Sequence, residues 1–478
     1  MTISMSFAST ANGATSGATG LKVVVIGGGF TGVAFIIHAI RAAQPGVGLD
    51  FTIVEPAAQL GRGVAYGTDE PQHRINVPSD RMSIFAADPG HATRWLLAHG
   101  AIDAGSADAR GHYYVSRARY GEYVAATLNE VVANAAPRVR VVHRRATATG
   151  LQKIGAGYVV QLADGTQLDA DRVALCFGHT PSKPPGVIDA EVFDDDRFVA
   201  HPWSADALRA IAPDASVLLV GTGLTMADVA VTLLERGHRG RITAISRRGL
   251  RPRPHGVFAD TGDFLGDAPA PRTARGLLRM LRERIATDEL ALGQGWHATA
   301  DAFRFQLPTL WNALPPIEKR RVVARLLPFW DVHRFRIAPQ IHDTVEKAIV
   351  DGQMTVVKAR IADIHRSAKG FRAGLAIAGG GREERDFDAV VFCTGAARDI
   401  DRNPLARSLI ESGIARLDAI GMGLDTDLLS RVRDASGNVS PGLFAFGPIT
   451  RGSFGEMTGA PDITRHVENV LGDALLGA

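Results

Sequence analysis

The sequence predicts an α/β protein with two Rossmann-like units, each made of a strand, a glycine-rich turn and a helix. The first unit reads KVVVIGGGFTG and places Gly27, Gly29 and Gly32 in the G-x-G-x-x-G spacing. The second unit reads SVLLVGTGLTMADVA and contains Gly221 and Gly223. In such a turn, glycines allow the bend, the close approach of a pyrophosphate and the packing of helix on strand, and the phosphates lie at the helix N-terminus. Two turns in one chain indicate that two dinucleotides are bound together.

The composition is that of an ordinary globular protein. The chain has 478 residues, of which 46% are hydrophobic and 22% charged, enough for two or three domains. Its net charge of +3 is too small to indicate nucleic-acid binding. Residues 1–20 are small and polar, so they predict a disordered tail rather than a signal peptide. We expect a cytoplasmic protein that binds no membrane. The sequence leaves open whether it forms a homo-oligomer.

The residues that follow the second strand of each unit differ between the two units. Glu55 ends the first of these strands, where a carboxylate accepts both ribose hydroxyls of an adenosine. Arg247 and Arg248 follow the other strand, and arginines attract the 2′-phosphate of NADPH, whereas a carboxylate would repel it. The alternative for Glu55 is a solvated carboxylate at a strand end. The alternative for the two arginines is that they are surface residues that bind no nucleotide. The pattern favours NADPH over NADH as the nicotinamide.

The two cysteines fall in similar apolar runs. Cys176 precedes Gly178, and Cys393 precedes Gly395, so each run predicts a strand whose terminal glycine admits the backbone close to a cofactor. The two cysteines are then predicted to be small, buried core residues. No Cys-pair motif is present, which argues against a disulfide reductase and against a cysteine-based metal site.

Periodic apolar residues predict a helical insertion at about 268–351. Within it, Asp331, His333 and Arg336 would bind an acidic or amino-acid-like substrate or the NADPH phosphate, with His333 as a proton shuttle. The alternative is a helix-end network that anchors the insertion to the core. In the glycine-rich segment near the C-terminus, Arg451 is a candidate contact for an anion beside a flavin.

Taken together, these segments resemble the two-dinucleotide-binding flavoprotein superfamily and, more narrowly, the bacterial FAD/NAD(P)-binding protein family. The resemblance rests on the first turn with Glu55 and on the segments GRGVAYGT, HRINVPSDRMS, WDVHRFRIAP and GPITRGSFGEMTGAPDI. N-hydroxylating and Baeyer–Villiger-type monooxygenases share this architecture. The resemblance implies an FAD domain split in sequence, at 21–190 and 386–478, with an NAD(P) domain inserted at 191–385.

The same resemblance implies roles for particular residues. The first glycine turn and Glu55 would hold the pyrophosphate and ribose of FAD. Arg62, Asn76, Met82 and the loop from Gly447 to Gly459 would lie along its ribityl chain and ring.

We expect an FAD-dependent oxidoreductase in which NADPH reduces the flavin. The first hypothesis is a monooxygenase that acts through a flavin C4a-hydroperoxide on a small polar or amino-acid-like substrate. The first alternative is an NADPH-dependent reductase or dehydrogenase with an organic acceptor. The second is a non-catalytic flavin-binding regulatory protein, which the second glycine turn argues against.

Overall fold

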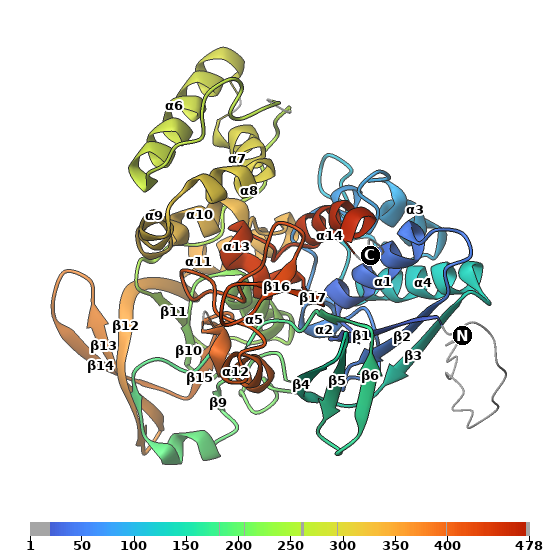
Figure 1. Cartoon of the computed structure of the whole chain (residues 1–478). Helices are drawn as coiled ribbons and strands as arrows, with labels where there is room; N and C mark the ends of the chain where they lie inside the picture. Colours follow the sequence, from blue (N-terminus) through green and yellow to red (C-terminus); the bar gives the residue numbers. More distant parts are fainter. Residues whose placement is uncertain are drawn as a thin grey trace.

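The computed structural model describes residues 20–180, 182–204, 206–259, 262–293, 295–397 and 399–474. The tail predicted at residues 1–20 therefore lies outside the described residues, apart from Gly20. Two sheets stand side by side, and a group of helices lies across one end of both (Figure 1). The α/β class with two parallel-stranded units is confirmed.

The first sheet has six strands in the order β16-β17-β7-β1-β2-β3. Strand β17 runs parallel to β7, so the end of the chain returns to complete a sheet begun by its start. The strands are β1 (Leu21–Ile26), β2 (Leu49–Val54), β3 (Val139–Arg144), β7 (Arg172–Leu175), β16 (Arg431–Arg433) and β17 (Val439–Ala445). A separate antiparallel sheet is formed by β4 (Ala148–Ile154), β5 (Gly157–Leu162) and β6 (Gln167–Ala170).

Helix α1 (Phe30–Ala42) is apolar around its whole circumference because it is enclosed by other elements. It packs against α4 (Arg117–Ala135) and α14 (Ala460–Ala474), and every residue from Phe30 to Ile40 is buried. A helix that is hydrophobic all round is a buried one. Among the described residues, no helix is both long and apolar enough to cross a membrane.

The second sheet has the order β14-β13-β12-β11-β10-β15-β9, with β8 beside β12. Its parallel strands are covered by α5 (Leu224–Glu235) and α11 (Pro339–Val350), which pack on each other. The strands are β8 (Val187–Ile188), β9 (Phe198–Val199), β10 (Val217–Val220), β11 (Ile242–Ser246), β12 (Met354–Ser367), β13 (Gly370–Ile377), β14 (Arg382–Phe387) and β15 (Ala389–Phe392).

Two boundaries differ from those expected from the sequence. Strand β15 pairs with β10, so the second sheet extends past residue 385, where we predicted that the first domain resumes. Helix α11 lies on the second sheet, so the insertion ends before Pro339 and not at residue 351 as expected. Both errors have one cause, since a buried parallel strand or a sheet-covering helix has the same apolar pattern in either domain.

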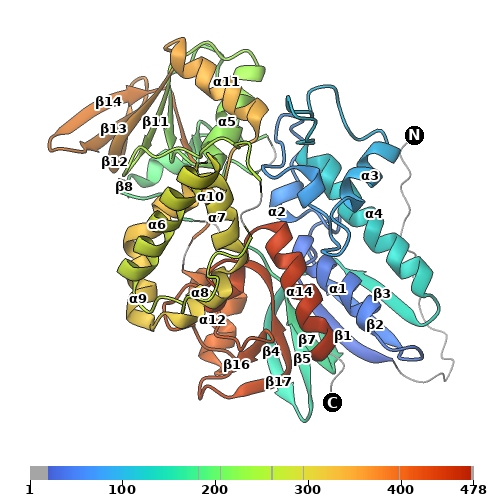
Figure 2. The ribbon, with the colours of Figure 1, turned by 90° about the horizontal axis from the view of Figure 1, so that it is seen from above.

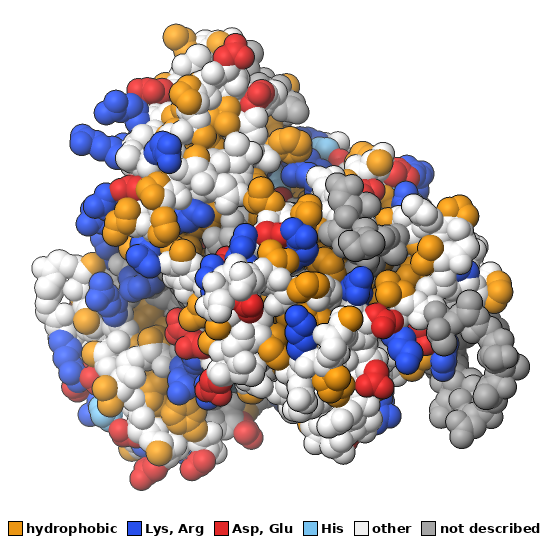
Figure 3. Space-filling model, viewed as in Figure 1, with side chains coloured by type: hydrophobic (Ala, Val, Ile, Leu, Met, Phe, Trp, Pro, Cys, Tyr) orange, Lys and Arg blue, Asp and Glu red, His pale blue; other side chains and the backbone are white. Residues whose placement is uncertain are grey.

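The insertion has its own small core, which contains Phe264, Phe303, Leu310 and Trp311. Its helices are α6 (Ala274–Leu292), α7 (Trp296–Phe305), α8 (Leu307–Ala313), α9 (Pro316–Arg321) and α10 (Leu327–Arg334), with a π-helical turn at Val322–Leu326. Seen from above, α7, α8 and α10 lie between the second sheet and α14 (Figure 2). Lysine and arginine side chains gather along the edge formed by α6 and α9 (Figure 3).

Shorter elements complete the fold. The α-helical ones are α2 (Gly63–Tyr66), α3 (His91–Ala98), α12 (Pro404–Glu411) and α13 (Arg451–Phe454). Single 3-10 turns occur at Ser79–Arg81, Ala190–Asp194, Ile400–Arg402 and Gly447–Thr450.

Candidate functional site

The first glycine turn joins β1 to α1 in a conformation that requires glycine. Gly27 has φ +105, and a Cβ there would lie 2.5 Å from the carbonyl oxygen of Cys176. A Cβ on Gly32 would lie 2.0 Å from the carbonyl oxygen of Gly27, so this glycine lets α1 approach β1. Gly29 begins the helix with an extended backbone and no side-chain cap. The first N–H groups of α1 are thus presented to a ligand.

Glu55 lies directly against this turn, at the end of β2. Its carboxylate accepts hydrogen bonds from the backbone N–H groups of Gly28 and Ala57, both at 2.9 Å. The segment from Gly61 to Gly63 covers the other side, since Gly61 N–H donates to the Gly28 carbonyl at 2.8 Å. Arg62 lies between these glycines, with its guanidinium 3.8 Å from Glu122. The structure therefore brings Glu55 and Arg62 to one glycine turn.

The second turn repeats this geometry between β10 and α5. Gly221 has φ +123, and a Cβ there would lie 2.2 Å from the carbonyl oxygen of Cys393. Gly223 begins α5, and nothing lies within 4 Å of where its Cβ would be. Met226 stands where the third glycine would be and is buried. The backbone at Gly223 therefore borders open space among the described residues.

The arginines after β11 lie beside this second turn. The Thr222 hydroxyl donates to the Ser246 hydroxyl at 2.8 Å, which ties the turn to the end of β11. Arg247 is exposed, and the Arg248 guanidinium lies 5.4 Å from the ring centre of Phe329 in α10. Arg248 therefore lies at the end of β11 and also contacts the insertion.

The strand-end segments that follow the two cysteines run side by side. The Ser182 and Thr394 hydroxyls are 2.6 Å apart, and Ala397 N–H donates to the Thr180 carbonyl at 2.8 Å. Gly395, with φ +72, lies in this pair of segments. Arg451, the first residue of α13, donates to the Ala397 carbonyl at 3.1 Å. The ends of the two sheets thus meet at Arg451.

Both cysteines are buried core residues, as the sequence predicts. Burial raises the pKa of each thiol far above its usual range, so neither Cys176 nor Cys393 is a reactive thiolate at neutral pH. The two residues lie in different sheets, at the ends of β7 and β15. A redox-active pair between them is therefore absent from the described residues.

The remaining residues assigned to the flavin surround α1 and the insertion. Met82 is buried, and its carbonyl accepts a hydrogen bond from the Tyr120 hydroxyl at 2.7 Å. Asn76 donates to the Arg336 carbonyl at 3.3 Å. Gly447 has φ +77, and a Cβ there would lie 2.7 Å from the hydroxyl oxygen of Thr31 in α1. Gly459 precedes α14, where a Cβ would lie 2.8 Å from the Arg304 guanidinium.

Asp331 and His333 both lie in α10 but take part in different contacts. Asp331 pairs with Arg334 at 2.9 Å. The His333 Nδ1–H donates to the Phe329 carbonyl at 2.7 Å, and its ring meets the edge of Trp296 with centres 4.7 Å apart. A neutral imidazole that donates through Nδ1 has an acceptor at Nε2.

Comparisons with known proteins bear on the identity of this site. Residues 24–180 match a family profile described as FAD-NAD(P)-binding. The chain contains an FAD-NAD(P)-binding domain. This confirms the resemblance seen in the sequence and the two cofactor classes predicted from it. No curated protein matches the sequence.

Solved structures extend the likeness over the whole chain. The ornithine N-hydroxylase of Kutzneria sp. 744 has a TM-score of 0.62 at 15% identity, covering 95% of this chain and 98% of that one. The L-lysine 6-monooxygenase of Pseudomonas syringae has a TM-score of 0.62 at 15% identity, covering 94% and 97%. The thioredoxin reductase of Lactococcus lactis has a TM-score of 0.53 at 12% identity, covering 96% and 100%. At these identities the likeness shows the fold alone.

Sequence reasoning missed a buried network beside the FAD-NAD(P)-binding domain. Glu456 lies just before α14 and pairs with Arg304 of α7 at 2.8 Å and with Arg334 of α10 at 2.6 Å. Arg304 also pairs with Asp462 at 2.6 Å. The network ties the insertion to α14, which is the anchoring role left as the alternative for this segment. The only signal in the sequence is that Glu456 is the single acid of the glycine-rich loop from Gly447 to Gly459.

A second missed contact joins the two nucleotide units. Arg117 of α4 pairs with Asp228 of α5 at 2.8 Å, and both side chains are largely buried. Beside this pair, His73 Nε2 lies 2.9 Å from the hydroxyl oxygen of Thr232. Asp228 is the only charged side chain between Leu224 and Leu234, so a lone acid in an apolar helix was the available signal.

Proposed function

We propose that the protein is an FAD-dependent oxidoreductase that uses NADPH and acts as a monooxygenase on a small polar or amino-acid-like substrate. The observation that carries this proposal is the meeting of the two strand-end segments. Each segment begins at the cysteine whose carbonyl packs on a glycine turn, and the Ser182–Thr394 contact joins them. Cofactors held on the two turns would therefore share one region of the molecule.

The chain's own residues divide the work of binding. The turn from Gly27 to Gly32 and Glu55 would hold the pyrophosphate and ribose of FAD, which supplies the electron-transfer and oxygen chemistry when bound. The turn at Gly221 and Gly223 and the following arginines would hold NADPH. Arg451 would place a positive charge where both strand-end segments meet, close to an anionic group.

His333 is our candidate for handling the substrate proton. Because its Nδ1–H is held by the Phe329 carbonyl, Nε2 is the atom that would accept a proton from a substrate ammonium. The Trp296 ring fixes the orientation of the imidazole. Asp331 would act through its pair with Arg334, which holds α10 in place beside Glu456.

The proposal is supported by the chain-long likeness to proteins named as an ornithine N-hydroxylase and an L-lysine 6-monooxygenase. Against a disulfide reductase, both cysteines are buried and lie in different sheets. The insertion reaches the residue next to Arg451, since Trp311 of α8 donates to the Gly452 carbonyl at 2.7 Å, so a substrate bound beside Arg451 would lie near the insertion.

The test is NADPH oxidation by the FAD-loaded protein, followed with L-ornithine, L-lysine and cadaverine as probes. We expect NADPH to reduce the flavin, and one probe to incorporate an atom from heavy-isotope molecular oxygen. Flavin reduction without incorporation, with release of hydrogen peroxide alone, would favour a reductase whose organic acceptor is another molecule. If NADPH leaves the flavin oxidised, the oxidoreductase proposal is wrong.

A further inference from the structure

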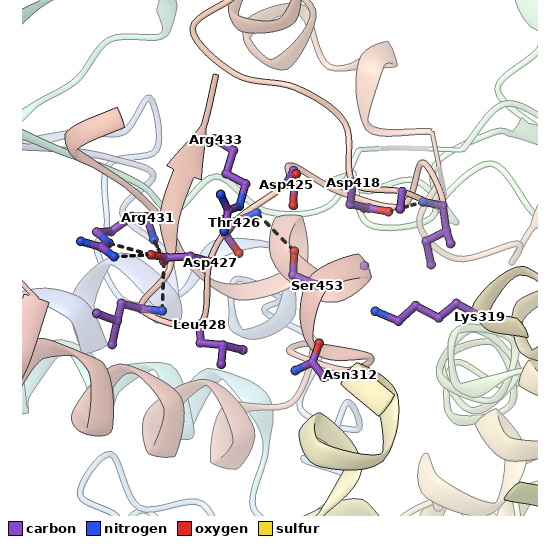
Figure 4. Close-up of a pocket in the computed structure, with 14 residues that line it drawn as sticks. Asn312, Lys319, Asp418, Asp425, Thr426, Asp427, Leu428, Arg431, Arg433 and Ser453 are labelled. Carbon is purple, nitrogen blue, oxygen red and sulfur yellow. Dashed lines mark hydrogen bonds and ion pairs between the residues drawn. The ribbon is translucent and has the colours of Figure 1, made fainter. Parts of the chain in front are cut away.

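A cavity of about 480 Å³ lies between the helical insertion and the C-terminal part of the first domain (Figure 4). One wall comes from α8 and α9, with Asn312 and Lys319. The opposite wall comes from the segment 418–433 and from α13, with Gly452 and Ser453. Its volume is in the range of small-molecule sites. Two of its lining residues, Gly452 and Ser453, belong to the loop assigned above to the flavin, whereas the other lining residues have no role in the proposed active site.

The carboxylates on one wall already have partners. Asp425 pairs with Arg416 at 2.6 Å, and Asp427 pairs with Arg431 at 2.6 Å. Asp418 accepts hydrogen bonds from the backbone N–H groups of Ile420 and Met422, and burial raises its pKa. This wall therefore presents fixed acceptor atoms, together with the guanidinium groups of Arg431 and Arg433, which also line the cavity.

The other wall presents donors for which no hydrogen-bond acceptor is found among the described residues, although the Lys319 amine lies 5.4 Å from the ring centre of Trp311. In Figure 4 the Lys319 amine and the Asn312 amide point into the same space, across from Asp418 and Ser453. Within the described part of the chain, Lys319 forms no ion pair; burial lowers its pKa, and the charges of Asp418 and Asp425 act in the opposite direction. The Ser453 hydroxyl oxygen accepts from the Thr426 N–H at 3.3 Å, which leaves the hydroxyl proton available.

Thr426 supplies an independent observation. It lines the cavity, it is 7% exposed, and its hydroxyl has no hydrogen-bond partner among the described residues. A buried polar group without a partner is uncommon in native proteins and calls for an explanation such as a ligand. Thr426 lies between Asp425 and Asp427 in the sequence and lines the same cavity as they do.

We propose that this cavity binds a small zwitterionic ligand of the α-amino-acid type. The ligand carboxylate would take the donors of Lys319, Asn312 and Ser453, and its ammonium would face Asp418 and the Thr426 hydroxyl. A ligand with both charges matches a cavity whose lining carries both signs of charge, whereas a cation or an anion would leave groups of one sign without a partner.

The site is distinct from the proposed active site but is connected to it. Trp311 of α8 donates to the Gly452 carbonyl of α13 at 2.7 Å, and α13 begins with Arg451. An occupied cavity would hold α8 and α13 together and so fix the backbone that carries Arg451. We therefore assign the cavity as an effector site rather than as a second catalytic site.

The test is isothermal titration of the FAD-loaded protein with three probes that share one side chain. L-norvaline is a zwitterion, L-norvalinamide a cation and N-acetyl-L-norvaline an anion, and none has a side-chain amine to be hydroxylated. We expect L-norvaline to bind and the other two to bind at least tenfold more weakly. Equal binding of the cation or the anion, or binding by no probe, would overturn the proposal.

Variants locate the binding. Lys319→Met and Ser453→Ala should each weaken L-norvaline binding at least tenfold, and Arg325→Met, which removes an exposed charge from the same insertion, should leave it unchanged. Each variant's melting temperature reports whether it is folded. Binding that survives Lys319→Met in folded protein would contradict the site. Since the readout is binding, it stands whether or not NADPH reduces the flavin.

Discussion

The two glycine turns have the same backbone but differ at the third position of the motif. Gly32 is enclosed, because a Cβ there would lie 2.0 Å from the Gly27 carbonyl oxygen. Met226 occupies the same position in the second turn and is itself a buried core residue. The first turn thus leaves no room for a side chain between α1 and β1, whereas the second turn accommodates the buried side chain of Met226. We infer that the first turn is built for a resident cofactor and the second for one that exchanges.

The helices that follow the two turns, α1 and α5, also differ in how they are enclosed. Position 34 on α1 is a buried alanine, and α1 is enclosed by apolar contacts with α4 and α14. The corresponding position on α5 is Asp228, which pairs with Arg117 across the boundary between the two units. An interface held by polar groups resembles the interfaces between domains that move.

The largest effect is expected from a methyl group added to each turn in parallel. Gly32→Ala places a Cβ against a backbone carbonyl, which cannot move as a side chain would, so the cost should exceed the about 1–3 kcal/mol of ordinary overpacking. We expect protein without FAD, or no soluble protein. Gly223→Ala meets nothing within 4 Å, so it should keep FAD and its melting temperature but bind NADPH more weakly.

Flavin content and NADPH titration measure the two outcomes separately. If Gly32→Ala retains FAD at the level of the unmodified protein, the two turns are equivalent and the comparison fails. If Gly223→Ala binds NADPH normally, the open space at that turn is not a pyrophosphate site.

The sequence predicted the parts of this comparison that depend on local patterns. Both turns, the strands before them and the matching strands that end at Cys176 and Cys393 follow from periodicity and glycine spacing. The contacts Arg117–Asp228 and Arg304–Glu456 join residues far apart in the chain, and a single sequence does not show which charges meet. The catalytic assignments of Asp331, His333 and Arg451 stay predictions, because they depend on where a substrate lies.

The next effect concerns the polar interface. Asp228→Asn leaves the largely buried Arg117 without its carboxylate, and breaking a buried pair by removing one partner costs about 3–5 kcal/mol. We expect a lower melting temperature and slower flavin reduction by NADPH, since α5 would no longer be held to α4. Reduction of the flavin by dithionite should be unchanged.

The double variant Arg117→Met, Asp228→Leu is the control for the charge itself. It replaces the pair by apolar side chains and should recover most of the stability. Recovery of NADPH reduction as well would mean that the pair acts through stability alone. A melting temperature unchanged by Asp228→Asn would contradict the buried pair.

A smaller effect is expected from the strand ends, where the first unit has Glu55 and the second has arginines. Arg247→Ala with Arg248→Ala should lower kcat/KM for NADPH by about 10–100-fold, as expected when charge-assisted hydrogen bonds worth about 1.5–3 kcal/mol are lost. The value for NADH should change little. Arg209→Ala, an exposed arginine of the same unit, is the matched control. An equal loss for both nucleotides would show that these arginines do not read the 2′-phosphate.

The smallest effect is a pH dependence of stability, which one buried histidine in each part of the molecule can test. Burial lowers the pKa of His466, on α14, to about 4, and burial also lowers that of His255, whose Nε2–H donates to the Asn76 carbonyl, to about 4. Between this value and the ordinary 6.5, the unfolded chain takes up a proton that the folded one does not, so the stabilising contribution is complete above pH 6.5 and is lost as the pH falls towards 4.

For these partly exposed rings we expect a contribution on the order of 1–2 kcal/mol each. Denaturant melts at several pH values should show a shallower acid loss for His466→Gln and for His255→Gln, and none of this change for the exposed His201→Gln. If only His255→Gln reduces the loss of stability with falling pH, the acid-sensitive contact lies at the boundary between the two units, and His466 does not contribute.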